Sequence, residues 1–235
     1  MKKKSHRRHT LENSSAVSLI SVADKSSQIS EQYRTIRTNI QFALSADQQI
    51  QTIVVTSSGP SEGKSTTAAN LAVVLADSGQ KVLLIDADMR KPTVHETFSL
   101  LNSNGLSMVL TTKHSVLESI QPSGIENLTI LTSGPKPPNP SELLGSARMD
   151  RVIEEARGHY DTIIFDMPPI VAVTDAQLMA SRADGTILVV RENVTRKESL
   201  AKAKELLAMV QARVLGVVYN GIQKTKDQDY YYSNK

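Results

Sequence analysis

Residues 53–67 read IVVTSSGPSEGKSTT, and this stretch decides how the rest of the chain is interpreted. Four β-forming residues, Ile53 to Thr56, lead into a turn that is rich in Ser, Gly and Pro. The turn ends in Gly63-Lys64-Ser65-Thr66, after which the sequence favours a helix. A strand, a glycine-containing loop and a helix N-terminus in this order are typical of a phosphate-binding loop.

The eight positions from Ser58 to Ser65 follow the P-loop pattern G-x-x-x-x-G-K-[ST], except that Ser58 replaces the first glycine and Gly59 follows it. In such a loop, successive backbone N–H groups point at the phosphates. Gly63 lets the backbone approach them, Lys64 reaches the β- and γ-phosphates, and the Ser65 hydroxyl is a ligand for Mg²⁺. The alternative is an ordinary tight turn, but the buried-type strand before it and the helix after it argue against that interpretation.

Acidic residues end two of the apolar segments, where a P-loop needs carboxylates for its metal ion. Asp166 follows the run Ile163-Ile164-Phe165, as in a Walker B strand. Asp86 and Asp88 end the segment VLLIDAD, one helix and one strand after the loop, and the alternation of a strand puts both on one side. Carboxylates beside Mg²⁺ and a γ-phosphate suit metal binding and general-base catalysis. For Asp88, capping of a turn is the alternative.

Continuously apolar runs such as VLLID and TIIFD indicate strands that are buried on both faces. Their alternation with helical patterns predicts an α/β fold, a doubly wound and mostly parallel sheet whose ligand lies at the carboxyl ends of the strands. We expect one domain at 29–222 between a basic, polar, flexible segment at 1–28 and a flexible tail at 223–235. The predicted strands are 52–56, 81–86, 128–132, 162–166, 185–191 and 214–220. The predicted helices are 31–44, capped by Ser30, and 64–78, 106–111, 115–120, 141–158, 175–182 and 197–211.

Composition excludes several classes of protein. The 235 residues include no cysteine, which rules out disulfides, thiolate metal sites and iron–sulfur clusters and fits a reducing cytosol. Trp is absent and aromatic residues make up 4%, which argues against base stacking and a nucleic-acid partner. No apolar run reaches the about 20 residues of a membrane span, and we expect no secretion signal. The five Lys/Arg within residues 1–9 favour a flexible basic tail, with weak attraction to an anionic membrane as the alternative. An apolar patch at 17–22 is a candidate contact for a partner.

Further segments carry a family resemblance: the helix at 30–37 (SEQYRTIR), the segment at 86–92 (DADMRKP), the segment at 134–144 (GPKPPNPSELL) and the cluster Tyr230-Tyr231-Tyr232. Together with the P-loop and IIFDMPP, they resemble the bacterial tyrosine kinases of capsule and exopolysaccharide systems, within the MinD/ParA-like branch of P-loop ATPases. The resemblance is greatest to the form in which the kinase is a separate cytoplasmic chain. It extends over roughly 29–232, and no single segment would establish it alone.

This resemblance implies a protein-tyrosine kinase that uses ATP and Mg²⁺, autophosphorylates Tyr230, Tyr231 and Tyr232 in trans and phosphorylates other proteins, thereby regulating polysaccharide synthesis or export. It implies Asp86 as base with Asp88 assisting. It also implies a membrane adaptor of the polysaccharide co-polymerase type that recruits the kinase to the inner face of the membrane, a counteracting tyrosine phosphatase, and a ring of copies such as an octamer. The implied metal ligands are Ser65, Asp86 and Asp166. The implied ATP-binding residues are Ser58, Gly59, Glu62, Gly63, Lys64, Ser65, Thr66 and Asn220; an Asx turn is the alternative for Asn220.

Glu31, Arg34 and Arg37 lie three residues apart on the first predicted helix. Their spacing alone favours a solvated stripe, whereas the resemblance implies a head-to-tail contact that closes a ring. Three consecutive tyrosines in a polar tail cannot pack into a core together, which favours a substrate tail over a β-edge fragment. Phosphorylation would add about −1.5 to −2 charges to each and drive the tail from an acidic pocket.

Two other functions fit a P-loop of this kind. A positioning ATPase of the MinD/ParA type carries a second lysine early in the loop, where this chain has Ser58, Gly59 and Pro60. Such proteins also use an amphipathic C-terminal helix, whereas 223–235 is polar throughout. An inactive nucleotide-binding module is the other alternative, but Lys64, Asp86 and Asp166 are all present. The sequence therefore favours the kinase.

Overall fold

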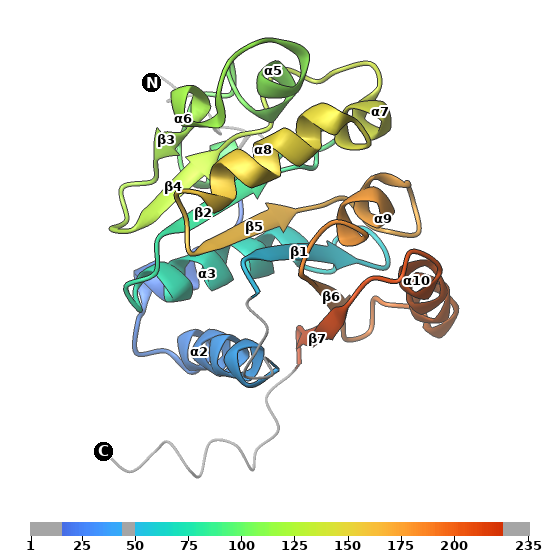
Figure 1. Cartoon of the computed structure of the whole chain (residues 1–235). Coiled ribbons are helices and arrows are strands. Elements are labelled where there is room, and N and C mark those ends of the chain that lie inside the picture. Colours follow the sequence, from blue (N-terminus) through green and yellow to red (C-terminus); the bar gives the residue numbers. More distant parts are fainter. Residues whose placement is uncertain (1–15, 44–49, 223–235) are drawn as a thin grey trace, which may run out of the picture.

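A computed structural model describes residues 16–43 and 50–222 of the chain. A seven-stranded sheet lies at its centre, in the order β3-β4-β2-β5-β1-β6-β7 (Figure 1). All neighbouring strands are parallel except β3 and β4, so the predicted doubly wound, mostly parallel sheet is confirmed. The strands are β1 (Thr52–Ser57), β2 (Val82–Asp86), β3 (Gln121–Pro122), β4 (Leu128–Leu131), β5 (Thr162–Asp166), β6 (Gly185–Arg191) and β7 (Val214–Asn220).

Helices cover both faces of the sheet (Figure 1). One face carries α1 (Ile20–Ala23), α2 (Gln28–Phe42), α3 (Lys64–Ala76) and α4 (Val94–Thr97). The other face carries α5 (Leu106–Thr111), α6 (Val116–Ser119), α7 (Pro140–Leu144), α8 (Ala147–Arg157), α9 (Asp175–Ala180) and α10 (Lys197–Met209).

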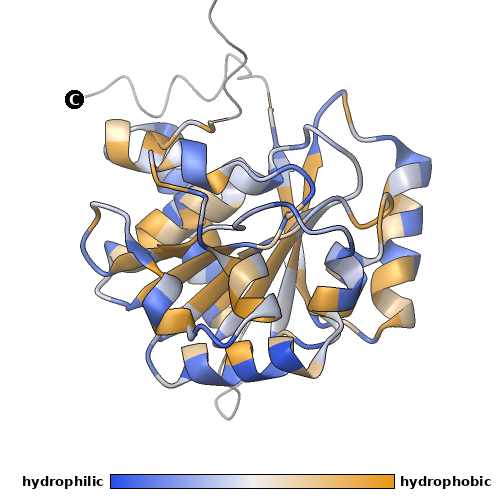
Figure 2. Ribbon diagram, turned by 90° about the horizontal axis from the view of Figure 1, so that it is seen from above, coloured by the Kyte–Doolittle hydropathy of each residue, from blue (hydrophilic) through white to orange (hydrophobic). Residues whose placement is uncertain are grey.

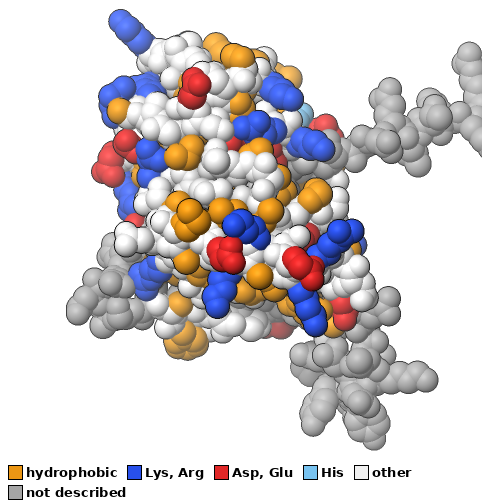
Figure 3. Space-filling view, turned by 90° about the vertical axis from the view of Figure 1, so that its right-hand side faces the viewer, with side chains coloured by type: hydrophobic (Ala, Val, Ile, Leu, Met, Phe, Trp, Pro, Cys, Tyr) orange, Lys and Arg blue, Asp and Glu red, His pale blue; other side chains and the backbone are white. Residues whose placement is uncertain are grey.

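The central strands contribute alternate side chains to two separate cores. Leu83 and Ile85 of β2 pack under α5 and α8, whereas Leu84 packs against α3 on the opposite face. Figure 2 shows these apolar strands enclosed between the helices. Burial on both faces explains why their sequences are continuously apolar. On the molecular face at the right of Figure 1, by contrast, Lys, Arg, Asp and Glu side chains are interspersed with separate hydrophobic groups (Figure 3).

Several predicted boundaries differ from the structure. The predicted helix at 141–158 is two helices, because the chain turns at Gly145 and Ser146. Helix α2 starts three residues before the predicted start: the hydroxyl of Ser27 accepts from the Ser30 backbone N–H, so Ser27 is the cap, and the hydroxyl of Ser30 donates to the Asp24 carbonyl. The short elements α1, α4 and β3 were not predicted, since each offers too few residues for a periodic pattern.

The N-terminal segment contacts the domain from Val17 onward, earlier than the predicted domain boundary at 29. Asn70, buried in α3, accepts from the Ser21 N–H and donates to the Ser18 carbonyl. Val17, Leu19 and Ile20 pack against the same core, so most of the apolar patch proposed for a partner contacts the domain itself. Residues 1–15, 44–49 and 223–235, including the basic N-terminus and the three tail tyrosines, lie outside the described residues. None of the helices in the described ranges combines the length and hydropathy that a membrane crossing requires.

Candidate active site

The P-loop joins β1 to α3 at the carboxyl end of the sheet, as predicted. Gly63 caps α3 with φ of +98°, in the left-handed region that favours glycine. A Cβ atom at this position would lie 2.1 Å from the side-chain nitrogen of Asn220, which donates to the Glu62 carbonyl. Gly63 is therefore required both by its backbone conformation and by the close approach of β7. Asn220 supports the loop in this way, and its contact with adenine stays a prediction.

The irregular start of the P-loop has a structural role. Glu62 is buried, and its carboxylate accepts from both the backbone N–H and the hydroxyl of Ser58, at 2.8 to 3.0 Å. A glycine at the first position would lack this hydroxyl. Ser58 thus closes the loop on itself through Glu62, while Arg191 at the end of β6 donates to the Ser61 carbonyl from outside. Sequence reasoning did not identify Arg191, because no local pattern marks a strand-end arginine as a loop contact.

Lys64 lies among the acidic side chains that end two other strands. Its ammonium is 2.9 Å from Asp88 Oδ2, 3.3 Å from Asp166 Oδ1 and 3.0 Å from the Ser65 hydroxyl. The structure therefore brings together the P-loop lysine, the serine predicted to bind the metal ion and both predicted acidic segments. Burial lowers the pKa of Lys64, but the carboxylates of Asp166 and Asp88 outweigh burial and raise it above its usual value.

Asp86 and Asp166 are fully buried opposite each other, because β2 and β5 are neighbours and pair these two residues in register. Burial raises the pKa of Asp86 to about 8, and the adjacent Asp166 raises it too. Burial likewise raises the pKa of Asp166, while Lys64 opposes that shift. The two carboxyl groups therefore do not both stay ionised without neutralisation: either one of them keeps a proton, or a cation balances their charge.

Backbone groups orient the carboxylates of Asp86, which ends β2, and of Asp88, which lies in the loop after it. One oxygen of Asp86 accepts from the N–H groups of Thr93 and Val94, at 3.1 and 3.0 Å. One oxygen of Asp88 accepts from the Lys91 N–H at 3.0 Å and so caps the turn of the loop. The other oxygen of Asp88 pairs with Lys64. Asp88 therefore both caps a turn and belongs to the site, and the two interpretations of this residue are compatible.

The carboxylates fit a metal ion that is held jointly with phosphates. Asp86 Oδ1 and Asp166 Oδ2 are buried and have no hydrogen-bond partner. In the part of the chain that the structure describes, no three acidic, His or Cys side chains converge as a metal site made by protein alone. Mg²⁺ at nucleotide sites takes one or two carboxylates and several phosphate and water oxygens, which agrees with this donor set. Ser65, Asp86 and Asp166 are the residues that would hold it.

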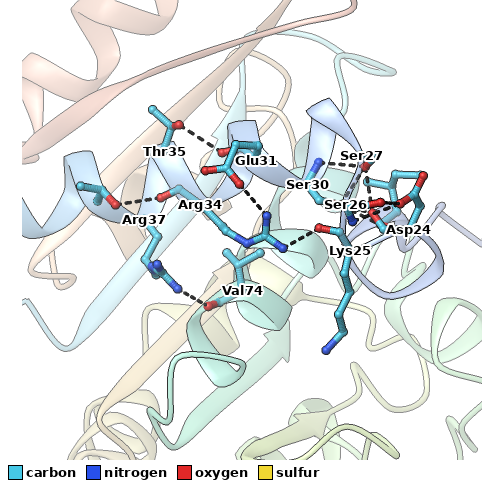
Figure 4. Close-up of polar contacts among 12 residues, drawn as sticks. Asp24, Lys25, Ser26, Ser27, Ser30, Glu31, Arg34, Thr35, Arg37 and Val74 are labelled. Carbon is cyan, nitrogen blue, oxygen red and sulfur yellow. Dashed lines mark hydrogen bonds and ion pairs between the residues drawn. The ribbon is translucent and has the colours of Figure 1, made fainter. Parts of the chain in front are cut away.

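The residues predicted for an oligomer contact make intramolecular bonds here (Figure 4). Arg34 pairs with Glu31 at 2.6 Å and donates to the Lys25 carbonyl, and Arg37 donates to the Val74 carbonyl of α3. An exposed ion pair such as Glu31–Arg34 contributes only about 0–1 kcal/mol, so it leaves both side chains available to another molecule. A role in assembly stays a prediction.

An ion pair beside the site, between a half-buried arginine and a buried carboxylate, is not marked in the sequence. Arg90, on the loop after β2, binds both carboxylate oxygens of Asp175 on α9, at 2.8 and 2.9 Å, and also the Ser141 hydroxyl. These residues are up to 85 positions apart in the sequence, so only the fold could bring them together.

A P-loop that follows a buried parallel strand, with a lysine among the acidic ends of the neighbouring strands, defines a nucleotide-binding P-loop domain. The chain matches the family model described as AAA domain over residues 50–215. It is 53% identical to the tyrosine-protein kinase YwqD of Bacillus subtilis, over 92% of both chains. The crystal structure of the chimerical protein CapA2B2 is 45% identical, with a TM-score of 0.84, over 88% of this chain and 90% of that one.

The kinase domain of the Escherichia coli tyrosine kinase ETK is 33% identical, with a TM-score of 0.84, over 94% of this chain and 85% of that one. The chain therefore belongs to the bacterial tyrosine-protein kinases. It is an enzyme of the nucleotide-binding kinase class, as the sequence predicted.

Proposed function

We propose that this kinase transfers the γ-phosphoryl group of ATP to Tyr230, Tyr231 and Tyr232 of a neighbouring copy, and to tyrosines of other proteins. The observation that carries the proposal is the contact of Lys64 with Asp88 and Asp166 at 2.9 and 3.3 Å. A cation and several carboxylates meet there, at the N-terminus of α3, where a γ-phosphate and its metal ion would be bound.

Each side chain has a distinct part in this transfer. Lys64 leaves Asp88 and Asp166 and binds the β- and γ-phosphates. The negatively charged phosphate oxygens then replace the carboxylates as partners of the ammonium group. Asp86 accepts the proton of the tyrosine hydroxyl as the general base. The tyrosine oxygen forms a bond to the γ-phosphorus, and the bond to the bridging oxygen of ADP breaks. When bound by Ser65, Asp86 and Asp166, Mg²⁺ would neutralise part of the negative charge of the phosphates.

The partners are proposed from the resemblance to the family. We expect a membrane adaptor that activates the kinase and holds it at the inner face of the cell membrane, with a tyrosine phosphatase opposing it. Glu31, Arg34 and Arg37 are proposed to contact the next copy in a ring. The pathway under control is the synthesis or export of capsule or exopolysaccharide.

The test is incubation of the full chain with Mg²⁺ and ATP, with and without the cytoplasmic segment of a candidate adaptor, followed by detection of phosphotyrosine. The wild-type chain should become labelled, and Lys64→Met should not, because the phosphate contact is lost. Mass spectrometry should locate the label at 230–232. Absence of phosphotyrosine under both conditions would refute the proposed reaction.

A further inference from the structure

We propose that Arg90 is a positioning residue for phosphoryl transfer: its ion pair with Asp175 and its hydrogen bond to Ser141 fix the loop that follows Asp86 and carries Asp88. This inference rests on the proposed function, because it concerns the same reaction. Arg90 contacts neither Lys64 nor the P-loop in the structure, and it acts through the loop that contains it.

The loop after β2 is held by internal polar contacts, by a hydrogen bond from the Ala87 N–H to the Asp166 carbonyl and by burial of Met89. Asp86 accepts from Thr93 and Val94, and Asp88 accepts from Lys91, so these bonds set the shape of residues 86–94. They do not set where the outer part of the loop lies relative to the helices beside it. Arg90 extends from this part and makes the polar link to α7 and α9.

The link has the geometry of a rigid clamp. Nε and Nη2 of Arg90 bind the two oxygens of Asp175, and Nη2 also lies 3.0 Å from the Ser141 hydroxyl. Ser141 in turn donates to Asp175 Oδ1 at 2.6 Å, so the three side chains form a closed triangle. Asp175 is completely buried, whereas Arg90 is 35% exposed. A planar guanidinium makes two parallel bonds of this kind, which a lysine ammonium cannot reproduce.

The clamp also gives a role to the segment at 134–144, which the reaction itself left unexplained. Ser141 is at the first turn of α7, within this proline-rich segment. Ser141 on α7 and Asp175 on α9 thus connect two helices of the same layer to the loop after β2. The P-loop is anchored separately, by Asn220 and Arg191 on the far side of β5 and β1. Loosening the clamp should therefore move Asp88 and the Thr93 and Val94 N–H groups that orient the Asp86 carboxylate, and leave the nucleotide-binding loop in place.

The experiment compares Arg90→Ala, Arg90→Lys, Asp175→Asn and Ser141→Ala in the full-length chain, with tyrosine labelling by ATP as the assay. Loss of an orienting partner should lower kcat by about 10- to 100-fold in Arg90→Ala and Asp175→Asn, and by less in Ser141→Ala. The KM for ATP should change by less than about threefold, and Arg90→Lys should not restore kcat. Arg182→Ala is the matched control, since Arg182 also pairs with a carboxylate at 2.8 Å, but its partner Asp150 is exposed instead of buried.

A second readout does not depend on tyrosine labelling. Calorimetric titration of Mg²⁺ into the chain saturated with ATP should show about tenfold weaker Mg²⁺ binding in Asp175→Asn than in the wild type, because the carboxylates are displaced. Unchanged kcat and unchanged Mg²⁺ affinity would overturn the inference, as would full activity of Arg90→Lys or an equal loss in Arg182→Ala. If Arg90→Ala unfolds because it leaves Asp175 unpaired, the kcat and Mg²⁺ affinity of Asp175→Asn and Ser141→Ala test the inference instead. A wild-type chain that labels no tyrosine refutes the proposed function alone, since the Mg²⁺ titration still tests the clamp.

Discussion

Replacing Asp86 with Asn should make the nucleotide-free protein more stable at neutral and alkaline pH while it abolishes the reaction. Asp86 is fully buried, and its pKa is raised from 3.8 to about 8. In the unfolded chain this carboxyl ionises near pH 4, whereas in the folded chain it keeps its proton until about pH 8. The unfolded state therefore loses a proton that the folded state retains, and stability falls as the pH rises between these two values.

The size of the effect follows from the same numbers. Between pH 3.8 and pH 7 the shift corresponds to about 1.4 kcal/mol per pH unit, or about 4 kcal/mol at pH 7. The Asn oxygen can still accept from Thr93 and Val94, but the amide nitrogen replaces an oxygen that has no partner, which costs about 1–3 kcal/mol. A net gain of about 1–3 kcal/mol is left, and it raises Tm by about 2–12 °C for a chain of this length.

Thermal unfolding followed by circular dichroism, from pH 5 to pH 8 and without nucleotide, measures this gain. The difference in Tm between Asp86→Asn and the wild type should be near zero at pH 5 and should grow toward pH 8. Asp150→Asn, at an exposed carboxylate, is the control and should show no such trend. A Tm difference that does not change with pH, or a lower Tm for Asp86→Asn at pH 8, would refute the reasoning. Tyrosine labelling should be lost in the same variant, because the base and a metal ligand are gone.

Three further substitutions test the packing around the site. Gly63→Ala should abolish ATP binding in calorimetry, whereas Gly79→Ala, at a similar φ of +90° but with open space around its Cβ, should keep it; equal affinities would contradict the account. Glu62→Ala should lower the free energy of unfolding by about 2–4 kcal/mol in urea, and Glu62→Gln by clearly less, because only the amide can still accept from the loop; equal losses would argue against the brace. Asn70→Ala should speed hydrogen exchange of the Ser21 amide by at least about tenfold, and unchanged protection there would show that Asn70 does not hold the N-terminal segment.

The sheet and the centre of the site could be predicted from local sequence. Strands such as β2 and β5 are continuously apolar because both faces are buried, and each ends in an acid because the parallel carboxyl ends meet at one edge. The positions of Asp86 and Asp166 follow from these two facts, and the position of Lys64 follows from the P-loop pattern.

Features that depend on distant contacts could not be predicted. Nothing near Arg90 in the sequence indicates Asp175 as its partner. Asn70 lies in α3, a helix buried on nearly all sides, so its sequence has no polar face against which a buried polar residue would stand out. The cap of α2 was placed at Ser30 instead of Ser27, because both serines precede the same apolar pattern. The choice between them depends on Asp24, whose carbonyl accepts from both hydroxyls.

The central claim is that the phosphoryl group reaches a tyrosine on a neighbouring copy, and a mixing experiment tests it most directly. One chain carries Lys64→Met and an intact tail, and the other keeps Lys64 but has Tyr230, Tyr231 and Tyr232 changed to Phe. With Mg²⁺ and ATP, neither chain alone should be labelled at 230–232, and the mixture should label the Lys64→Met chain there. If the wild type is labelled while the Lys64→Met chain stays unlabelled in the mixture, transfer between copies is contradicted.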